Sequence, residues 1–104
     1  MSIENDENEK ALTSPRQVAR SLRRIFQREF GGKAAGRYRL DPGRLRKLAG
    51  REHLRLSFLR DVNEFLLERG FVLTNAGDFF VVQRVVQLEK AIRQVPYAII
   101  RELS

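Results

Sequence analysis

The sequence predicts a single small α+β domain with a three-helix core and a late β-hairpin. Two stretches, residues 15–30 and 57–70, carry apolar residues at helical spacing. Residues 71–73 and 79–82 are β-favouring runs joined by a turn that contains Asn and Gly, which is typical of a hairpin. The chain of 104 residues suits one domain, and its 42% hydrophobic residues are enough for one core.

The first helix is predicted to begin at Ser14 and Pro15, a capping side chain followed by a residue whose missing N–H costs nothing in the first turn. It is expected to run to Phe30, where Gly31-Gly32 ends it. Its two faces differ: the apolar one holds Val18, Ala19, Leu22, Ile25, Phe26 and Phe30, and the opposite one holds Arg16, Arg20, Arg23, Arg24, Gln27 and Arg28. One face therefore packs and the other is an arginine ridge.

Residues 37–40 alternate with period two and predict a short strand with Tyr38 and Leu40 on one side and two arginines on the other. Asp41-Pro42 repeats the cap-then-proline start and opens a short second helix, which Gly50 ends. In that helix Leu45 and Leu48 face inward, and Arg44, Arg46 and Lys47 face outward.

The third helix is expected to start between Glu52 and Ser57 and to end at Gly70. Its apolar stripe holds Phe58, Leu59, Val62, Phe65 and Leu66. After the hairpin, a second stripe at spacings of three and four predicts a C-terminal helical segment that Pro96 breaks in two. This stripe holds Val85, Leu88, Ile92, Val95, Ile99 and Leu103, and a homodimer through it is expected.

The charge is concentrated in one half of the chain. The net charge is +7, and residues 16–60 alone hold fourteen bases and three acids. Residues 1–13 form an acidic stretch expected to be a disordered tail, so the domain is placed at residues 14–104. A basic half favours an anionic partner such as nucleic acid. No apolar run approaches a membrane span, and a cytoplasmic, nucleoid-associated protein is expected.

The sequence holds few of the residue types that catalytic and metal sites use. There is no cysteine, and His53 is the only histidine, so neither a thiolate metal site nor a histidine triad can be assembled. Residues 31–36 lack the G-x-x-x-x-G-K-[ST] register of a phosphate-binding P-loop. We therefore expect neither an enzyme nor a cofactor.

The order helix, short strand, short helix, longer helix, hairpin resembles that of winged helix-turn-helix DNA-binding domains. The residues that carry the resemblance are Leu45-x-x-Leu48-Ala49-Gly50 and Leu59-x-x-Val62-x-x-x-Leu66-x-x-x-Gly70-Phe71. Asn63 departs from the pattern, because the family commonly has an apolar residue there. The resemblance implies that the third helix enters the major groove while other elements contact phosphates.

On this reading, two sets of residues contact duplex DNA. The phosphate contacts are Arg20, Arg23, Arg24, Arg28, Lys33, Arg37, Arg39, Arg44, Arg46, Lys47 and Arg51. The residues near base edges are Arg55, Ser57 and Arg60, although Ser57 is equally plausible as the cap of the third helix. The hairpin holds Asp78 and no base, which favours a structural role for it.

The expected function is sequence-specific or semi-specific DNA binding, in a transcription regulator or a plasmid, phage or chromosome-maintenance factor. Two alternatives remain open. A protein-interaction module is favoured by the acidic side of the third helix, with Asp61, Glu64 and Glu68, and by the apolar C-terminal stripe. An RNA binder would use the same arginines.

Overall fold

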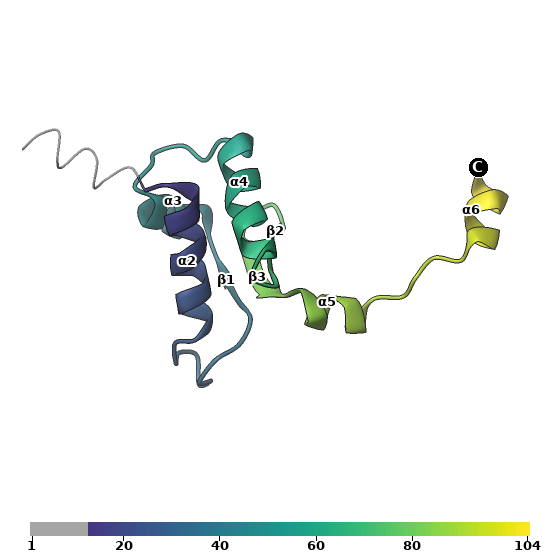
Figure 1. The fold of residues 1–104 in the computed structure, drawn as a ribbon, viewed down its shortest axis with the longest axis horizontal. Coiled ribbons are helices and arrows are strands. Elements are labelled where there is room, and N and C mark those ends of the chain that lie inside the picture. The colour runs from purple at the N-terminus through teal and green to yellow at the C-terminus, as the bar shows by residue number, and fades with distance from the viewer. Residues whose placement is uncertain (1–12) are drawn as a thin grey trace, which may run out of the picture.

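The computed structural model describes residues 13–104 and confirms a small α+β fold. Of the predicted acidic tail, residues 1–12 lie outside the described residues. The elements are α2 (Pro15–Phe26), β1 (Tyr38–Leu40), α3 (Pro42–Ala49), α4 (Leu56–Leu67), β2 (Phe71–Asn75), β3 (Phe80–Arg84), α5 (Val85–Ala91) and α6 (Tyr97–Leu103), as Figure 1 shows.

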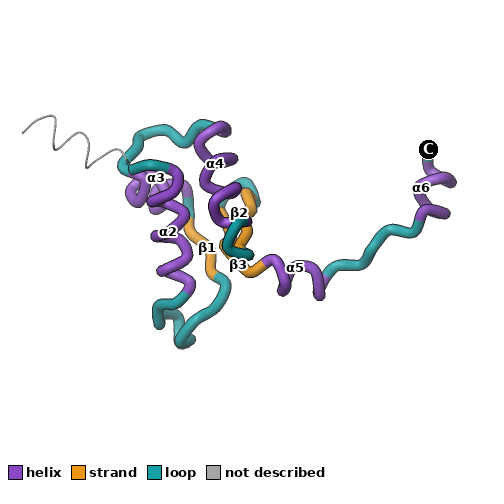
Figure 2. The backbone as a smooth tube through the Cα atoms, in the orientation of Figure 1, coloured by secondary structure: helices purple, strands orange, loops and turns teal. Residues whose placement is uncertain are grey.

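The three strands form one antiparallel sheet in the order β1-β3-β2 (Figure 2). The hairpin pairs Leu73 with Val82, and Val82 in turn lies opposite Tyr38 of β1. The short strand therefore adds to the outer side of the hairpin and has one free edge. Helix α2 packs against α4, and α4 packs against β2.

The core lies between these helices and the sheet. The most deeply buried side chains come from α2, α3, α4 and β3: Val18, Leu22, Leu45, Val62, Leu66 and Val82. Tyr38 and Leu40 of β1 are buried beside them. The predicted inward faces of the three helices and of β1 are confirmed for these positions, and Ile25, Leu48, Leu59 and Phe65 pack against the core while partly exposed. Burial of these stripes is the main force that holds the domain together.

The first helix ends four residues before its predicted end at Phe30. Phe30 and Lys33 exchange two backbone hydrogen bonds of 3.0 Å each, so the chain reverses direction between them. Gly31 and Gly32 sit in that turn at φ 59° and 80°, a conformation that glycine adopts without strain. The double glycine thus builds a tight turn, and Phe30 is 47% exposed instead of lying on the packing face.

The helix starts predicted from sequence are confirmed for α2 and α3. Ser14 and Gln17 form a reciprocal capping box, and the Asp41 carboxylate accepts a 2.7 Å hydrogen bond from the Arg44 amide. Gly50 caps α3 in the left-handed conformation, at φ 65°.

The start of α4 falls inside the predicted window, but its cap differs from the one considered. Arg55 occupies the N-cap position without a side-chain hydrogen bond, and Ser57 lies within the first turn. The reading of Ser57 as the cap is therefore wrong. The helix proper ends at Leu67, and a turn carries the chain to Gly70.

Asn63, the residue that departs from the family pattern, ties α4 to the sheet. Its Oδ1 accepts a 2.9 Å hydrogen bond from the Leu73 amide. A polar side chain is tolerated at this partly buried position because it satisfies a strand amide. In the hairpin, Phe80 is buried in the core, whereas Phe79 is only partly buried and lies just before β3.

Pro96 separates two short helices, as predicted. Val85 and Leu88 of α5 are partly buried, but Ile92, Val95, Ile99 and Leu103 are exposed. Helix α6 buries no residue and stands apart from the rest of the domain in Figure 1. The predicted C-terminal stripe is therefore not one continuous surface.

One buried hydrogen bond links β1 to α2. The Tyr38 hydroxyl donates to the Leu22 carbonyl over 2.7 Å, and the ring of Tyr38 is buried. Burial raises the pKa of the Tyr38 phenol well above its usual value of about 10. The neutral phenol is the form that the folded state prefers.

Tyr38→Phe is expected to lower the free energy of unfolding by about 1 kcal/mol at neutral pH, because the hydrogen bond is lost. Since the folded pKa of Tyr38 is raised, its contribution is complete below pH 10 and is lost as pH rises above that value. The difference between wild type and variant should therefore shrink above about pH 10 in urea titrations. Equal pH dependence in both proteins would contradict this assignment; Tyr97, present in both, is the internal control.

Candidate nucleic-acid interface

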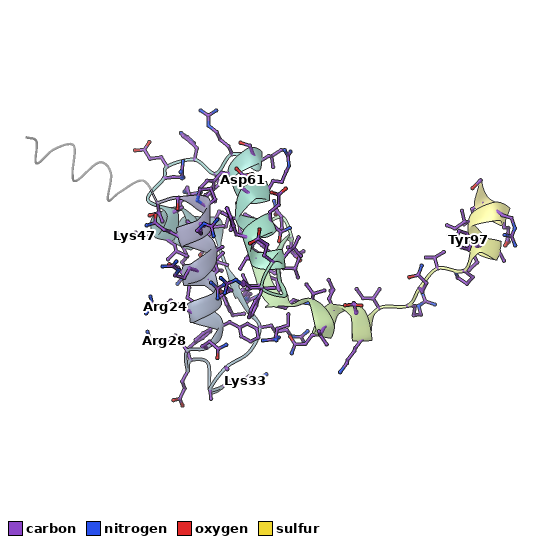
Figure 3. The ribbon with its side chains drawn as sticks, viewed as in Figure 1. Arg24, Arg28, Lys33, Lys47, Asp61 and Tyr97 are labelled. Atoms are coloured by element: carbon purple, nitrogen blue, oxygen red, sulfur yellow. The ribbon has the colours of Figure 1, made fainter. Side chains whose placement is uncertain are left out.

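The cationic side of the domain is formed by α2, the loop after it, β1 and α3. Figure 3 places Arg24, Arg28, Lys33 and Lys47 along α2, its following loop and α3, whereas Asp61 lies on α4. All four basic side chains are exposed. The arrangement follows from α2 burying Val18, Leu22 and Phe26, which leaves its arginines on the solvent side.

Most of these cations form no ion pair with a carboxylate of the described residues. Within residues 13–104 there is one ion pair, Arg44 to Asp41 at 2.6 Å. The hydrogen bond from the Arg44 amide, followed by the charge of Arg44, lowers the pKa of the Asp41 carboxyl. Asp41 is thus the ionised cap of α3, and the remaining arginines of this side have no carboxylate partner within residues 13–104.

Four cations surround one hollow beside β1. The hollow measures about 300 Å³, and its walls come from the end of α2, the glycine turn and the strand. Its basic residues are Arg28, Lys33, Arg37 and Arg39, and no acidic residue lines it. Like charges gathered in this way repel one another unless an anion is present, so the hollow fits a phosphate group.

Two further hollows continue this one along β1, and all three share Arg39. The second is largely apolar, with Phe30 and Leu48 in its wall, and the third is lined by Arg44, its ion-pair partner Asp41, and Phe79. We call this continuous surface the β1 groove and define its cations as Arg28, Lys33, Arg37, Arg39 and Arg44. The β1 groove runs beside the three-residue strand at one edge of the sheet.

The aromatic residues of the β1 groove hold its shape. The Phe30 ring meets the Tyr38 ring edge-on at 6.0 Å between centroids, and the Arg39 guanidinium lies 5.5 Å from the centre of the Phe79 ring. The first contact fixes the glycine turn against β1. The second orients Arg39 without using up its hydrogen-bond donors, which stay available for an anion.

The predicted phosphate contacts on α2 divide into two kinds. Arg20 and Arg24 are exposed and lie on the same side as the β1 groove's Arg28 by helical spacing. Arg23 is only partly exposed, and its Nε is buried without a hydrogen-bond partner among residues 13–104. Arg20 and Arg24 can extend the groove along α2, whereas Arg23 is less available.

A second basic group lies at the end of α3. Arg46 and Lys47 are exposed and line a shallow depression with Arg51. Arg51, however, is used inside the domain: its guanidinium lies 4.1 Å from the centre of the Phe58 ring and donates a 3.1 Å hydrogen bond to the Thr13 carbonyl. Sequence reasoning missed this role, because nothing in the local pattern places Phe58 and Thr13 beside Arg51.

The three predicted base-reading residues are exposed at the start of α4 but lie in mixed surroundings. Arg55, Ser57 and Arg60 share this end of the helix with Leu56, which is 74% exposed. The same outer side of α4 also carries one more exposed leucine and three exposed acids: Leu67, Asp61, Glu64 and Glu68. An apolar and acidic helix face is a poor match for the phosphates that line a DNA groove.

Other kinds of site are not evident in residues 13–104. No group of three or more His, Asp or Glu side chains is placed to hold a metal ion. His53 is exposed in the loop before α4, and Asp78 is exposed in the hairpin turn. None of the helices in this part of the chain is long and apolar enough to cross a bilayer.

Comparison with known proteins gives no relative to guide the assignment. No family model, curated protein or solved structure matches this chain.

Arg51→Ala is expected to destabilise the domain by about 1 to 2 kcal/mol, because it removes both the ring contact and the hydrogen bond. Arg46→Ala, on the exposed side of the same helix end, is the matched control and should stay within about 0.5 kcal/mol of wild type. Thermal or urea unfolding measures both. Equal stabilities for the two variants would show that Arg51 has no internal role.

Proposed function

We propose that this chain is a winged-helix-like domain that binds duplex DNA through phosphate contacts in the β1 groove, extended by Arg20 and Arg24 of α2 and by Arg46 and Lys47 of α3. The main observation in support is one hollow beside β1 that four cations line and no acidic residue lines: Arg28, Lys33, Arg37 and Arg39. Arginine forks match phosphate geometry, and backbone contacts of this kind supply most of the affinity of a DNA-binding protein.

The arrangement of elements supports the winged-helix part of the proposal. The order α2, β1, α3, α4, β2, β3 resembles the order of elements in winged helix-turn-helix domains. The pairing of β1 with β3 joins the early strand to the hairpin in one sheet. In this domain, however, the densest positive charge lies beside β1 and α2 and not on the exposed side of α4.

Base reading by α4 has less support than phosphate binding. Arg60 is one base among three acids and two exposed leucines on the outer side of that helix. Affinity for DNA is therefore expected to depend on phosphate contacts and to vary modestly with sequence.

Lys33→Gln and Arg37→Gln are expected to weaken binding about equally on all duplex sequences. Each should reduce the slope of log K against log salt by about 0.9, because each removes one phosphate contact. Arg69→Gln, at an exposed arginine beyond the end of α4, is the matched control and should change neither quantity. Fluorescence anisotropy on duplex DNA across a salt series gives both readouts.

An unchanged slope for Lys33→Gln and Arg37→Gln would remove the β1 groove from the interface. Structured RNA in the same series tests the remaining nucleic-acid alternative. Tighter binding of RNA than of duplex DNA at equal charge would replace DNA as the partner while keeping the groove.

Arg60→Ala tests base reading by α4 separately. We expect the ratio of affinities for different duplex sequences to stay unchanged, because the surroundings of Arg60 do not favour entry into a groove. A bidentate contact to guanine would instead make the variant lose about 1 to 3 kcal/mol of discrimination at one position. Competition binding with a randomised duplex library distinguishes the two results.

A further inference from the structure

Helix α6 carries an apolar face that the protein itself leaves uncovered. Tyr97, Ile99, Ile100 and Leu103 are 81%, 44%, 50% and 79% exposed. At about 100° per residue they occupy one side of the helix, while Arg101 and Glu102 occupy the other. A short amphipathic helix of this kind is stable in water only when its apolar face packs against something.

The domain carries an uncovered apolar surface of matching character on α4. Leu56 and Leu67, 74% and 47% exposed, lie on its outer side. Next to them is a hollow of about 280 Å³ between α4 and the hairpin, whose walls include Leu56, Leu59, Leu73 and Phe80. The polar residues in its wall are Arg60, Asn63 and Asn75. We call this surface the α4 hollow; it can receive one or two aliphatic side chains.

We propose that α6 of one copy docks on the α4 hollow of a second copy, and that two copies exchange their C-terminal arms in a symmetric dimer. Ile100 and Leu103 enter the hollow beside Leu56. Such an exchange is self-complementary and closes at two subunits, because each copy supplies one arm and one acceptor.

The course of the chain favours a second copy as the occupant. The segment between α5 and α6 is extended, with Ile92 at φ −120° and ψ 134° and Pro96 at φ −69° and ψ 148°. It carries α6 away from its own domain (Figure 3, where Tyr97 marks the helix). Proline in an extended hinge resists folding back and is compatible with an exchanged arm.

The charges at the margins of the two surfaces are complementary. Arg101 borders the apolar face of α6 by helical spacing, and Glu64 borders the α4 hollow next to Arg60. Residues 85–104 hold Lys90, Arg93 and Arg101 against Glu89 and Glu102, a net charge of +1, whereas α4 and its C-cap hold Asp61, Glu64 and Glu68 against Arg60. Opposite charges at the rim of an interface favour docking of α6 on α4 of the second copy over docking of α6 on the second copy's α6.

The mass of the full chain in solution, measured by sedimentation at increasing concentration, tests the proposal. Wild type should approach twice the mass of one 12.1 kDa chain. Leu103→Asp in the arm and Leu56→Asp in the acceptor should each weaken self-association at least about tenfold, a change of about 1.4 kcal/mol. Both positions are exposed, so both variants should fold. Val86→Asp, at a 53% exposed apolar residue outside both surfaces, is the matched control and should dimerise like wild type.

A mixture of the two variants makes the test specific. Leu56→Asp keeps an intact arm and Leu103→Asp keeps an intact acceptor, so the mixture should form a heterodimer through one good contact, weaker than wild type but stronger than either variant alone. A monomeric wild type would overturn the proposal, as would a dimer that Leu56→Asp leaves unchanged or a mixture that does not associate. Binding of DNA by each variant through the β1 groove is a separate readout and should persist.

Discussion

The arrangement of the site depends on the attachment of β1 to both the sheet and α2. Three residues of strand pair with β3, and the buried hydrogen bond from Tyr38 to Leu22 fixes the same segment to the first helix. With Tyr38 and Leu40 held inward, period-two geometry points Arg37 and Arg39 outward at the free edge. The glycine turn then brings Lys33 and Arg28 to the same place. Without that attachment the four cations would sit on a loose connection and would not share a hollow.

The second feature that shapes the molecule is the division of its surface by chemistry. Arginines cover α2, β1 and α3, and among the described residues only Arg44 has a carboxylate partner; acids with exposed leucines cover α4. An anionic ligand would lower the electrostatic repulsion among the arginines. Contact with another apolar surface would remove the exposed leucines from water, which is favourable. The nucleic acid and the second copy that we propose as partners would therefore occupy different sides of one small domain.

Several arginines serve the fold in addition to, or instead of, a ligand. Arg16 lies 4.5 Å from the centre of the Phe65 ring, Arg51 lies on Phe58, and Arg84 lies 5.2 Å from the centre of the Phe71 ring. The flat guanidinium stacks on an aromatic face while its edge stays hydrated, so it covers a ring at the margin of a small core. Part of the high arginine content is thus explained by packing at the margin of a small core, independently of any ligand.

Most of the helices and strands could be predicted from the amino-acid sequence, because caps, glycine stops and apolar spacing act over a few residues. Ser14, Asp41 and Gly50 mark helix ends through local hydrogen bonds and backbone conformation, and Pro96 breaks a helix wherever it stands in one. Only the folded chain shows which side chains meet: Arg51 lies on Phe58 and reaches the Thr13 carbonyl, and the densest charge flanks β1 and not α4. These outcomes involve residues distant in the chain, and no local pattern encodes the distance between them.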